Sequence, residues 1–139
     1  MGLLDSLFGK NKKEDIVSQT DVVQTGFEDW SAKRSREKLL AEMKEMLESN
    51  FQDYEIVFEY PASMLDSTSH PACTPVQFMF QKEEKNVLAV VVVKQNTYRG
   101  MNVVGTKNLC NERGIPYIRF FEEYPNKEEY VIPRIREYL

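Results

Sequence analysis

The spacing of apolar residues after residue 30 changes from a helical to a strand period, and this change predicts an α/β domain. In residues 31–49, apolar side chains recur every three to four positions with charged residues between them, which is typical of an amphipathic helix. Residues 54–60 alternate aromatic or aliphatic side chains with acidic ones, the period of a half-buried strand, and Pro61 ends that strand. We therefore expect a helix followed by a strand.

Two further strands are predicted on either side of a charged turn. Residues 76–81 and 87–94 are the strand segments, and residues 82–86 form the turn between them. The second segment is almost wholly aliphatic, so both of its faces must be covered, as in a central strand of an α/β sheet.

A second helix and a fourth strand follow. Residues 100–113 carry a weaker apolar stripe of helical spacing, and Gly114 is a suitable residue to end that helix. Residues 117–121 then read as a strand. Because a helix separates this strand from the hairpin, it can lie parallel to a neighbour.

The chain ends with an additional helix. Asn126 and Glu129 have the spacing of a capping box at its start, and Pro133 is expected to kink it or divide it into two pieces. The complete order of helix, three strands, helix, strand and terminal helix predicts a mixed four-stranded sheet flanked by helices.

Length and composition favour one domain, which we place at residues 26–139. The chain has 139 residues and is 42% hydrophobic, enough for one core. Residues 1–25 have no clear period and are expected to form a flexible arm, with weak peripheral membrane contact through residues 1–13 as a minor alternative. No apolar run is long enough for a transmembrane segment, and two cysteines are too few for a disulfide scaffold, so we expect a cytoplasmic protein.

Charge is unevenly distributed along an acidic chain. The net charge is −4, yet residues 94–120 contain five basic side chains and one acidic side chain. A locally basic face suits a phosphate-bearing partner, and the alternative is a merely solvated helix face. The candidates for nucleic-acid binding are Lys94, Arg99, Lys107 and Arg113.

The hairpin is expected to bring Gln77, Val92 and Lys94 together if its strands pair without a bulge. With Lys82 opposite Val87, Gln77 would lie opposite Val92, and Lys94 would share the face of Val92. A slip of one residue would reverse the faces and remove this grouping.

With its strand ending Val92-Val93-Lys94, the segment at 111–120 and the element order described above, residues 31–139 resemble the restriction-endonuclease-like, or PD-(D/E)XK, superfamily. The resemblance implies a hairpin that supplies an aspartate and a glutamate to hold Mg²⁺, and a lysine that positions or activates water. Carried over by position, the aspartate site is Gln77, the glutamate site is Val92 and the lysine site is Lys94.

The departure from that pattern predicts a domain that binds but does not cut. Mg²⁺ prefers carboxylate oxygens, whereas Gln77 offers a neutral amide and Val92 offers no ligand. We therefore expect no catalytic residues, metal or other cofactor, and a binding or regulatory module for nucleic acid. One alternative is a protein-interaction or structural protein. A second is a Mg²⁺-dependent nuclease with relocated acids, for which the candidates are Glu37, Glu42, Glu59 and Asp66.

Overall fold

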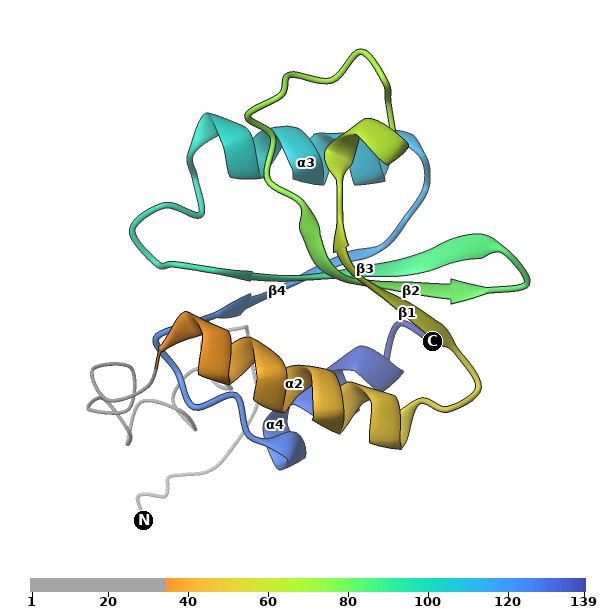
Figure 1. Ribbon diagram of the computed structural model, residues 1–139, viewed down its shortest axis with the longest axis vertical. Helices are drawn as coiled ribbons and strands as arrows, with labels where there is room; N and C mark the ends of the chain where they lie inside the picture. Colours follow the sequence, from red (N-terminus) through yellow and green to blue (C-terminus); the bar gives the residue numbers. More distant parts are fainter. Residues whose placement is uncertain (1–34) are drawn as a thin grey trace.

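The computed structural model describes residues 35–139, which form a sheet covered by helices on both faces (Figure 1). The helices are α2 (Arg36–Asn50), α3 (Met101–Glu112) and α4 (Glu128–Arg136), with a short 3₁₀ helix η2 (Ala62–Met64). The strands are β1 (Glu55–Tyr60), β2 (Val76–Lys82), β3 (Lys85–Val93) and β4 (Tyr117–Phe121). The predicted arm at residues 1–25 and the membrane contact at residues 1–13 lie outside the described residues.

The sheet is mixed, as the sequence predicts. Its strand order is β1-β2-β3-β4, with β1–β2 and β2–β3 antiparallel and β3–β4 parallel. The α/β class and the four-stranded mixed sheet flanked by helices are therefore confirmed. Strands β1 and β4 form the two edges of the sheet.

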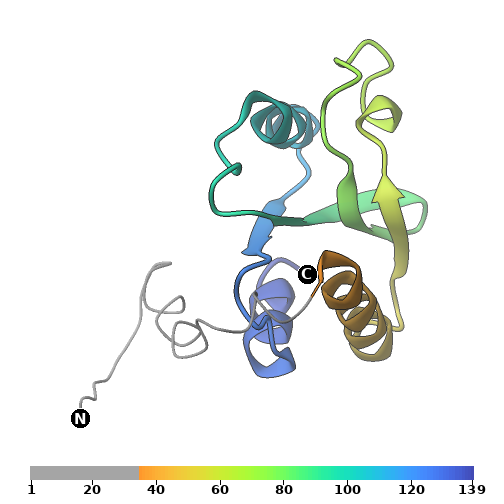
Figure 2. The same ribbon diagram turned by 60° about the vertical axis from the view of Figure 1, so that its left-hand side comes forward.

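Each face of the sheet has its own apolar core. Helices α2 and α4 cover one face, where Phe80, Val92 and Phe120 are buried against them, and α3 covers the other face (Figures 1 and 2). On the α3 face the buried residues include Met79 and Val91. The alternation of burial along β2 and β3 thus sends neighbouring side chains into different cores. No helix within residues 35–139 is long and apolar enough to cross a membrane.

Helix α2 begins at an N-cap that the amphipathic pattern alone does not locate. The Ser35 hydroxyl accepts a hydrogen bond from the Lys38 main-chain N–H at 3.1 Å, which satisfies one of the unpaired donors at the helix start. The apolar stripe at Leu39, Met43 and Leu47 is fully buried against the sheet. The helix is therefore held by packing along one face, as its period predicts.

The predicted hairpin register is wrong by two residues at the turn and by one residue beyond the bulge. The turn contains only Glu83 and Glu84, both with positive φ (53° and 66°), the geometry of a two-residue type I′ turn. Lys82 consequently lies opposite Lys85, a β-bulge between Phe80 and Gln81 shifts the pairing, and Phe78 faces Val90. Contrary to the prediction, Gln77 therefore does not lie directly opposite Val92.

Helix α3 ends as predicted at Gly114. This residue has φ +69°, and the Ile115 N–H bonds back to the Cys110 carbonyl at 2.9 Å. Together these features form a Schellman-type helix end, which favours glycine because a side chain is strained at positive φ.

Two details of the terminal helix differ from prediction. The N-cap of α4 is Lys127, whereas Asn126 is a buried residue with φ +52° whose amide donates to the carbonyls of Phe121 and Tyr124. Asn126 therefore fastens the β4–α4 turn instead of forming the expected capping box. The helix also continues through Pro133 as one element, so of the two predicted outcomes, a kink or a division, the division is wrong.

Burial of ionisable groups near α3 and β4 predicts loss of stability in alkali. Burial raises the pKa of the Cys110 thiol from 9.0 to about 11, and burial followed by the Cys110 charge raises that of Tyr117 to about 12. Between about pH 9 and 11 the unfolded chain has lost the thiol proton and the folded chain keeps it. The free energy of unfolding should therefore fall by about 1.4 kcal/mol per pH unit there, measured by urea titration. In Cys110→Ala the pH at which stability begins to fall should move towards 10. An unchanged onset would contradict the assignment of this loss to the Cys110 thiol.

Candidate functional site

Strand β2 leaves β3 near Gln77, and a side chain takes over the hydrogen bond of the missing strand. The Ala89 N–H bonds to the Pro116 carbonyl, so by alternation the main-chain groups of Val92 point towards β2. The last β2–β3 pair on that side is Phe78 with Val90. Beyond it, the Val92 N–H donates to Gln77 Oε1 at 2.8 Å, while Gln77 Nε2 donates to the Pro75 carbonyl at 3.1 Å. Both ends of the Gln77 amide are thus engaged with main chain.

The carbonyl of Val92 is satisfied from a different element. Arg36, the first residue of α2, donates from Nη1 to the Val92 oxygen at 3.0 Å and to Glu122 Oε1 at 2.6 Å. Glu122 follows β4 directly, and its side chain is 15% exposed. Arg36 therefore joins α2, β3 and the end of β4. We call Gln77, Val92, Arg36 and Glu122 the strand-junction network.

The residues at the positions that the resemblance assigns to a metal do not fit a divalent cation. The Gln77 oxygen is occupied by the Val92 N–H, and the Val92 side chain is 1% exposed within the apolar core. Glu122 is the carboxylate in this network, and it is paired with Arg36. Mg²⁺ needs several oxygen ligands, usually with one or two carboxylates, so this arrangement offers it no binding site.

None of the proposed relocated acids converts the network into a metal site. Hydrogen bonds from the Thr68 hydroxyl and N–H hold the pKa of Asp66 below its usual range, and Arg113 adds to this effect. Glu37 and Glu42 are exposed on α2, and Glu59 is exposed at the end of β1. Across residues 35–139 no three His, Cys, Asp or Glu side chains gather in a way that could hold a metal ion.

The strand-junction network predicts a specific cost for losing the Gln77 amide. In Gln77→Leu the buried Val92 N–H and the Pro75 carbonyl lose their partner, which should lower the free energy of unfolding by about 1–3 kcal/mol. Gln81→Leu is the matched control, because the half-buried Gln81 amide donates to the Asn86 side chain rather than to main chain. Equal losses in the two variants, measured by urea unfolding, would contradict a special role for Gln77.

Cationic and aromatic side chains gather beside β4 at the carboxyl end of the parallel strand pair. The Tyr98 ring lies 4.5 Å from the Arg119 guanidinium carbon and 5.2 Å from that of Arg99, and Arg99 Nε also donates to the Tyr98 hydroxyl at 2.9 Å. Phe121 packs edge-on against both Tyr98 and Tyr124. We call these five residues the cation–aromatic cluster. Arg119 was not predicted as a binding residue, because the strand period at 117–121 directs attention to the core.

Lys94 lies at the exposed end of β3, close in sequence to this cluster. It forms no ion pair with any residue in 35–139, in contrast to Arg36. The next residue, Gln95, donates from its main-chain N–H to Glu123 and from its side chain to the Tyr124 hydroxyl at 2.8 Å. These bonds fix the turn after β3, which begins with Lys94, against the β4–α4 turn.

The structure does not bring all four predicted basic residues together. Arg99 precedes α3 and Arg113 follows it, so the helix, roughly 18 Å long at 1.5 Å per residue, separates them. Arg113 instead donates to the Leu65 carbonyl and lies 3.8 Å from Asp66, which ties α3 to the loop after η2. Lys107 is exposed on α3 between the two ends. Arg113 therefore makes a structural contact, and the four predicted residues do not form one compact group.

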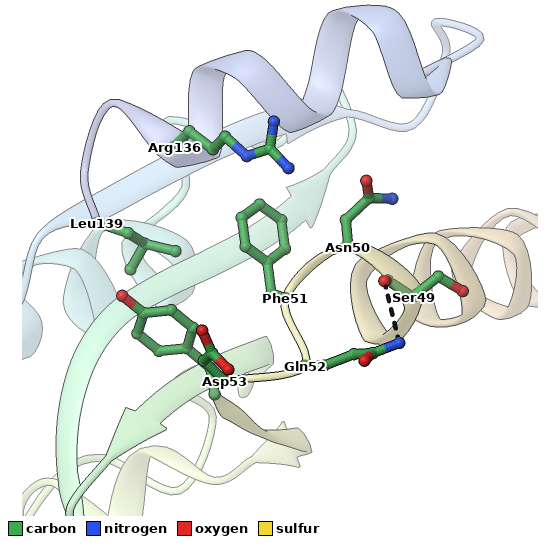
Figure 3. Close-up of a pocket in the computed structure, with 8 residues that line it drawn as sticks. Ser49, Asn50, Phe51, Gln52, Asp53, Arg136 and Leu139 are labelled. Atoms are coloured by element: carbon green, nitrogen blue, oxygen red, sulfur yellow. Dashed lines mark hydrogen bonds between the residues drawn. The ribbon is translucent and has the colours of Figure 1, made fainter.

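A groove of about 560 Å³ lies on the side of the sheet that α2 and α4 cover, where the end of α2 meets the end of α4 (Figure 3). Phe51 forms part of its lining with the Arg136 guanidinium 5.6 Å from the ring, and Asp53 and Leu139 also line it. Arg136 and Asp53 lie on different walls of the groove and do not form an ion pair with each other. This groove was not predicted from the sequence.

Comparison with known proteins does not assign this chain to a family. No family model matches this chain, and neither the curated proteins nor the solved structures contain a significant match to it.

Proposed function

We propose that this chain is a non-catalytic binding module of restriction-endonuclease-like fold that holds single-stranded nucleic acid at the cation–aromatic cluster. The observation that carries the proposal is the Tyr98 ring lying against two guanidinium groups, those of Arg119 and Arg99, at 4.5 and 5.2 Å. Single-stranded nucleic acids are bound by aromatic rings that stack on bases and by cations that contact phosphates. Arginine groups beside an aromatic ring supply both kinds of contact.

The strand-junction network supports the non-catalytic part of the proposal. Gln77 and Val92 stand where the family resemblance places carboxylates, and their polar groups hold main chain instead of ligand. Lys94 can attract a phosphate by its charge, but a lone ammonium group neither polarises a phosphodiester as a metal does nor generates hydroxide. Binding without turnover is the chemistry that these residues support.

The proposal is tested by fluorescence anisotropy with a labelled single-stranded oligonucleotide. Affinity for the full chain should fall steeply with NaCl concentration, because phosphate contacts release counterions. The double variant Lys94→Ala, Arg99→Ala should reduce the salt slope by about 1.4, since each lost contact to a single strand contributes about 0.7. Tyr98→Ala should weaken binding by about 1–3 kcal/mol, the usual contribution of one stacked base.

Matched controls lie at the other end of the sheet. Lys85 is an exposed lysine at the hairpin, and Lys82 lies 4.8 Å from the Tyr54 ring, so this pair has a similar charge and a similar cation–aromatic contact. The double variant Lys82→Ala, Lys85→Ala should leave affinity and salt slope unchanged. Equal losses in both double variants would show a diffuse charge effect and overturn the assigned surface. Absence of salt-sensitive binding at low ionic strength would overturn the nucleic-acid proposal and favour the protein-interaction alternative.

A further inference from the structure

Strand β4 has one edge that no other strand of residues 35–139 covers. The Pro116 carbonyl and the Glu122 N–H both bond to β3, so by alternation the even-numbered residues of β4 face β3. The main-chain N–H and C=O groups of Tyr117, Arg119 and Phe121 consequently point away from the sheet. The edge therefore offers alternating donors and acceptors at the spacing of a strand.

Most of these groups have no hydrogen-bond partner in the described part of the chain. The Phe121 carbonyl is occupied, since it accepts from the Tyr124 N–H at 3.2 Å and from the Asn126 amide at 2.9 Å. No bond within residues 35–139 engages the outward groups of Tyr117 and Arg119 or the Phe121 N–H. The open stretch thus runs along β4 and stops at the β4–α4 turn.

The other sheet edge differs in ways that oppose strand addition. Glu59 in β1 has φ +53°, which breaks the extended backbone, and both Glu55 and Glu59 are exposed there. Irregular backbone and charged side chains are the usual protection of edge strands. The β4 edge carries one charge, Arg119, whose guanidinium lies against Tyr98 and Phe121.

We propose that the β4 edge binds an extended acidic peptide as a fifth strand of the sheet. A residue opposite Arg119 on an added strand would have its Cβ about 5 Å away, where a carboxylate is favourable. Arg99, which lies against the same Tyr98 ring as Arg119, places further positive charge beside this strand. A second copy of this chain is a poorer occupant: antiparallel pairing over the full length of β4 sets Arg119 directly opposite its own equivalent, and like charges there are destabilising.

The test uses the full ¹⁵N-labelled chain and a synthetic acetylated peptide of sequence Glu-Val-Glu-Val-Glu-Val. Binding should be saturable in an NMR titration, and it should slow hydrogen exchange at the amides of Tyr117, Arg119 and Phe121 but leave Ile118 and Phe120 unchanged. A Lys-Val peptide of the same length should bind at least tenfold more weakly. No saturable binding, or equal binding of the two peptides, would overturn the proposal.

Two substitutions at one position separate main-chain pairing from charge. Arg119→Ala keeps the outward N–H and should lower the affinity for the acidic peptide by at most about fivefold, the usual range for one cross-strand pair. Arg119→Pro removes that N–H without touching a bond to β3, so it should abolish binding, and its circular dichroism should confirm that the domain stays folded. Peptide binding that survives Arg119→Pro in the folded domain would contradict strand addition. If the three outward amides already exchange slowly in the chain alone, the edge is covered and the proposal fails; neither result depends on the nucleic-acid proposal.

Discussion

Replacing Val92 by glutamate, the residue that the family resemblance places there, should lower the free energy of unfolding by about 3–5 kcal/mol, the cost of an uncompensated buried charge. The Val92 side chain is 1% exposed and packs among apolar residues below α2 and α4. Arg36 reaches the Val92 carbonyl but already pairs with Glu122, so the new carboxylate would lack a cation of its own. The substitution should therefore damage the core rather than rebuild a metal site.

The pH dependence of Val92→Glu distinguishes charge from volume. Burial should raise the folded-state pKa of the new carboxyl above its unfolded value of about 4.3. The charge-dependent loss of stability should then be smallest below pH 4 and grow as pH rises above that value. Val92→Gln should show a smaller loss with no such dependence. If urea unfolding gave Val92→Glu the stability of the unchanged chain at pH 7, Val92 would line an open cleft, and the account would be wrong.

Truncation of Phe80 should have an effect of similar size, about 3–5 kcal/mol, because it opens a cavity in the larger core. Phe80 is 0% exposed, and its ring meets those of Phe51 and Tyr54 edge-on at 5.4 and 6.0 Å. Phe58→Ala is the matched control on the neighbouring strand, since Phe58 is only half-buried. Urea titration should give the control a clearly smaller loss; equal losses would show that Phe80 is not central to packing.

The sequence was a good guide to elements whose burial follows a simple period. Helix α2, strand β3 and strand β4 appear where apolar spacing places them, because each buries one face or both. The sequence was a poor guide where main-chain geometry determines how two strands pair. Glu83 and Glu84 adopt positive φ although neither is a typical residue of a type I′ turn, and this turn together with the bulge sets the register.

The candidate site was predicted only in part for the same reason. Gln77 and Val92 do meet, but through a side chain and a main-chain N–H rather than through two facing side chains. The role of Arg36 depends on a contact 56 residues away in sequence, which no local pattern carries. Tyr98 and Arg119 come together because the turn after β3 folds back over β4. Long-range contacts of this kind follow from the fold and not from spacing.

The central claim is that Gln77 and Val92, the positions that the resemblance assigns to metal ligands, hold main chain together and do not bind a divalent ion. Paramagnetic broadening by substoichiometric Mn²⁺ in the full ¹⁵N-labelled chain tests it directly, since Mn²⁺ accepts the same hard oxygen ligands as Mg²⁺. The account predicts that the amide signals of Gln77, Val92 and Lys94 keep the average intensity of residues 35–139. Selective loss of those three signals, reversed by excess Mg²⁺, would contradict it.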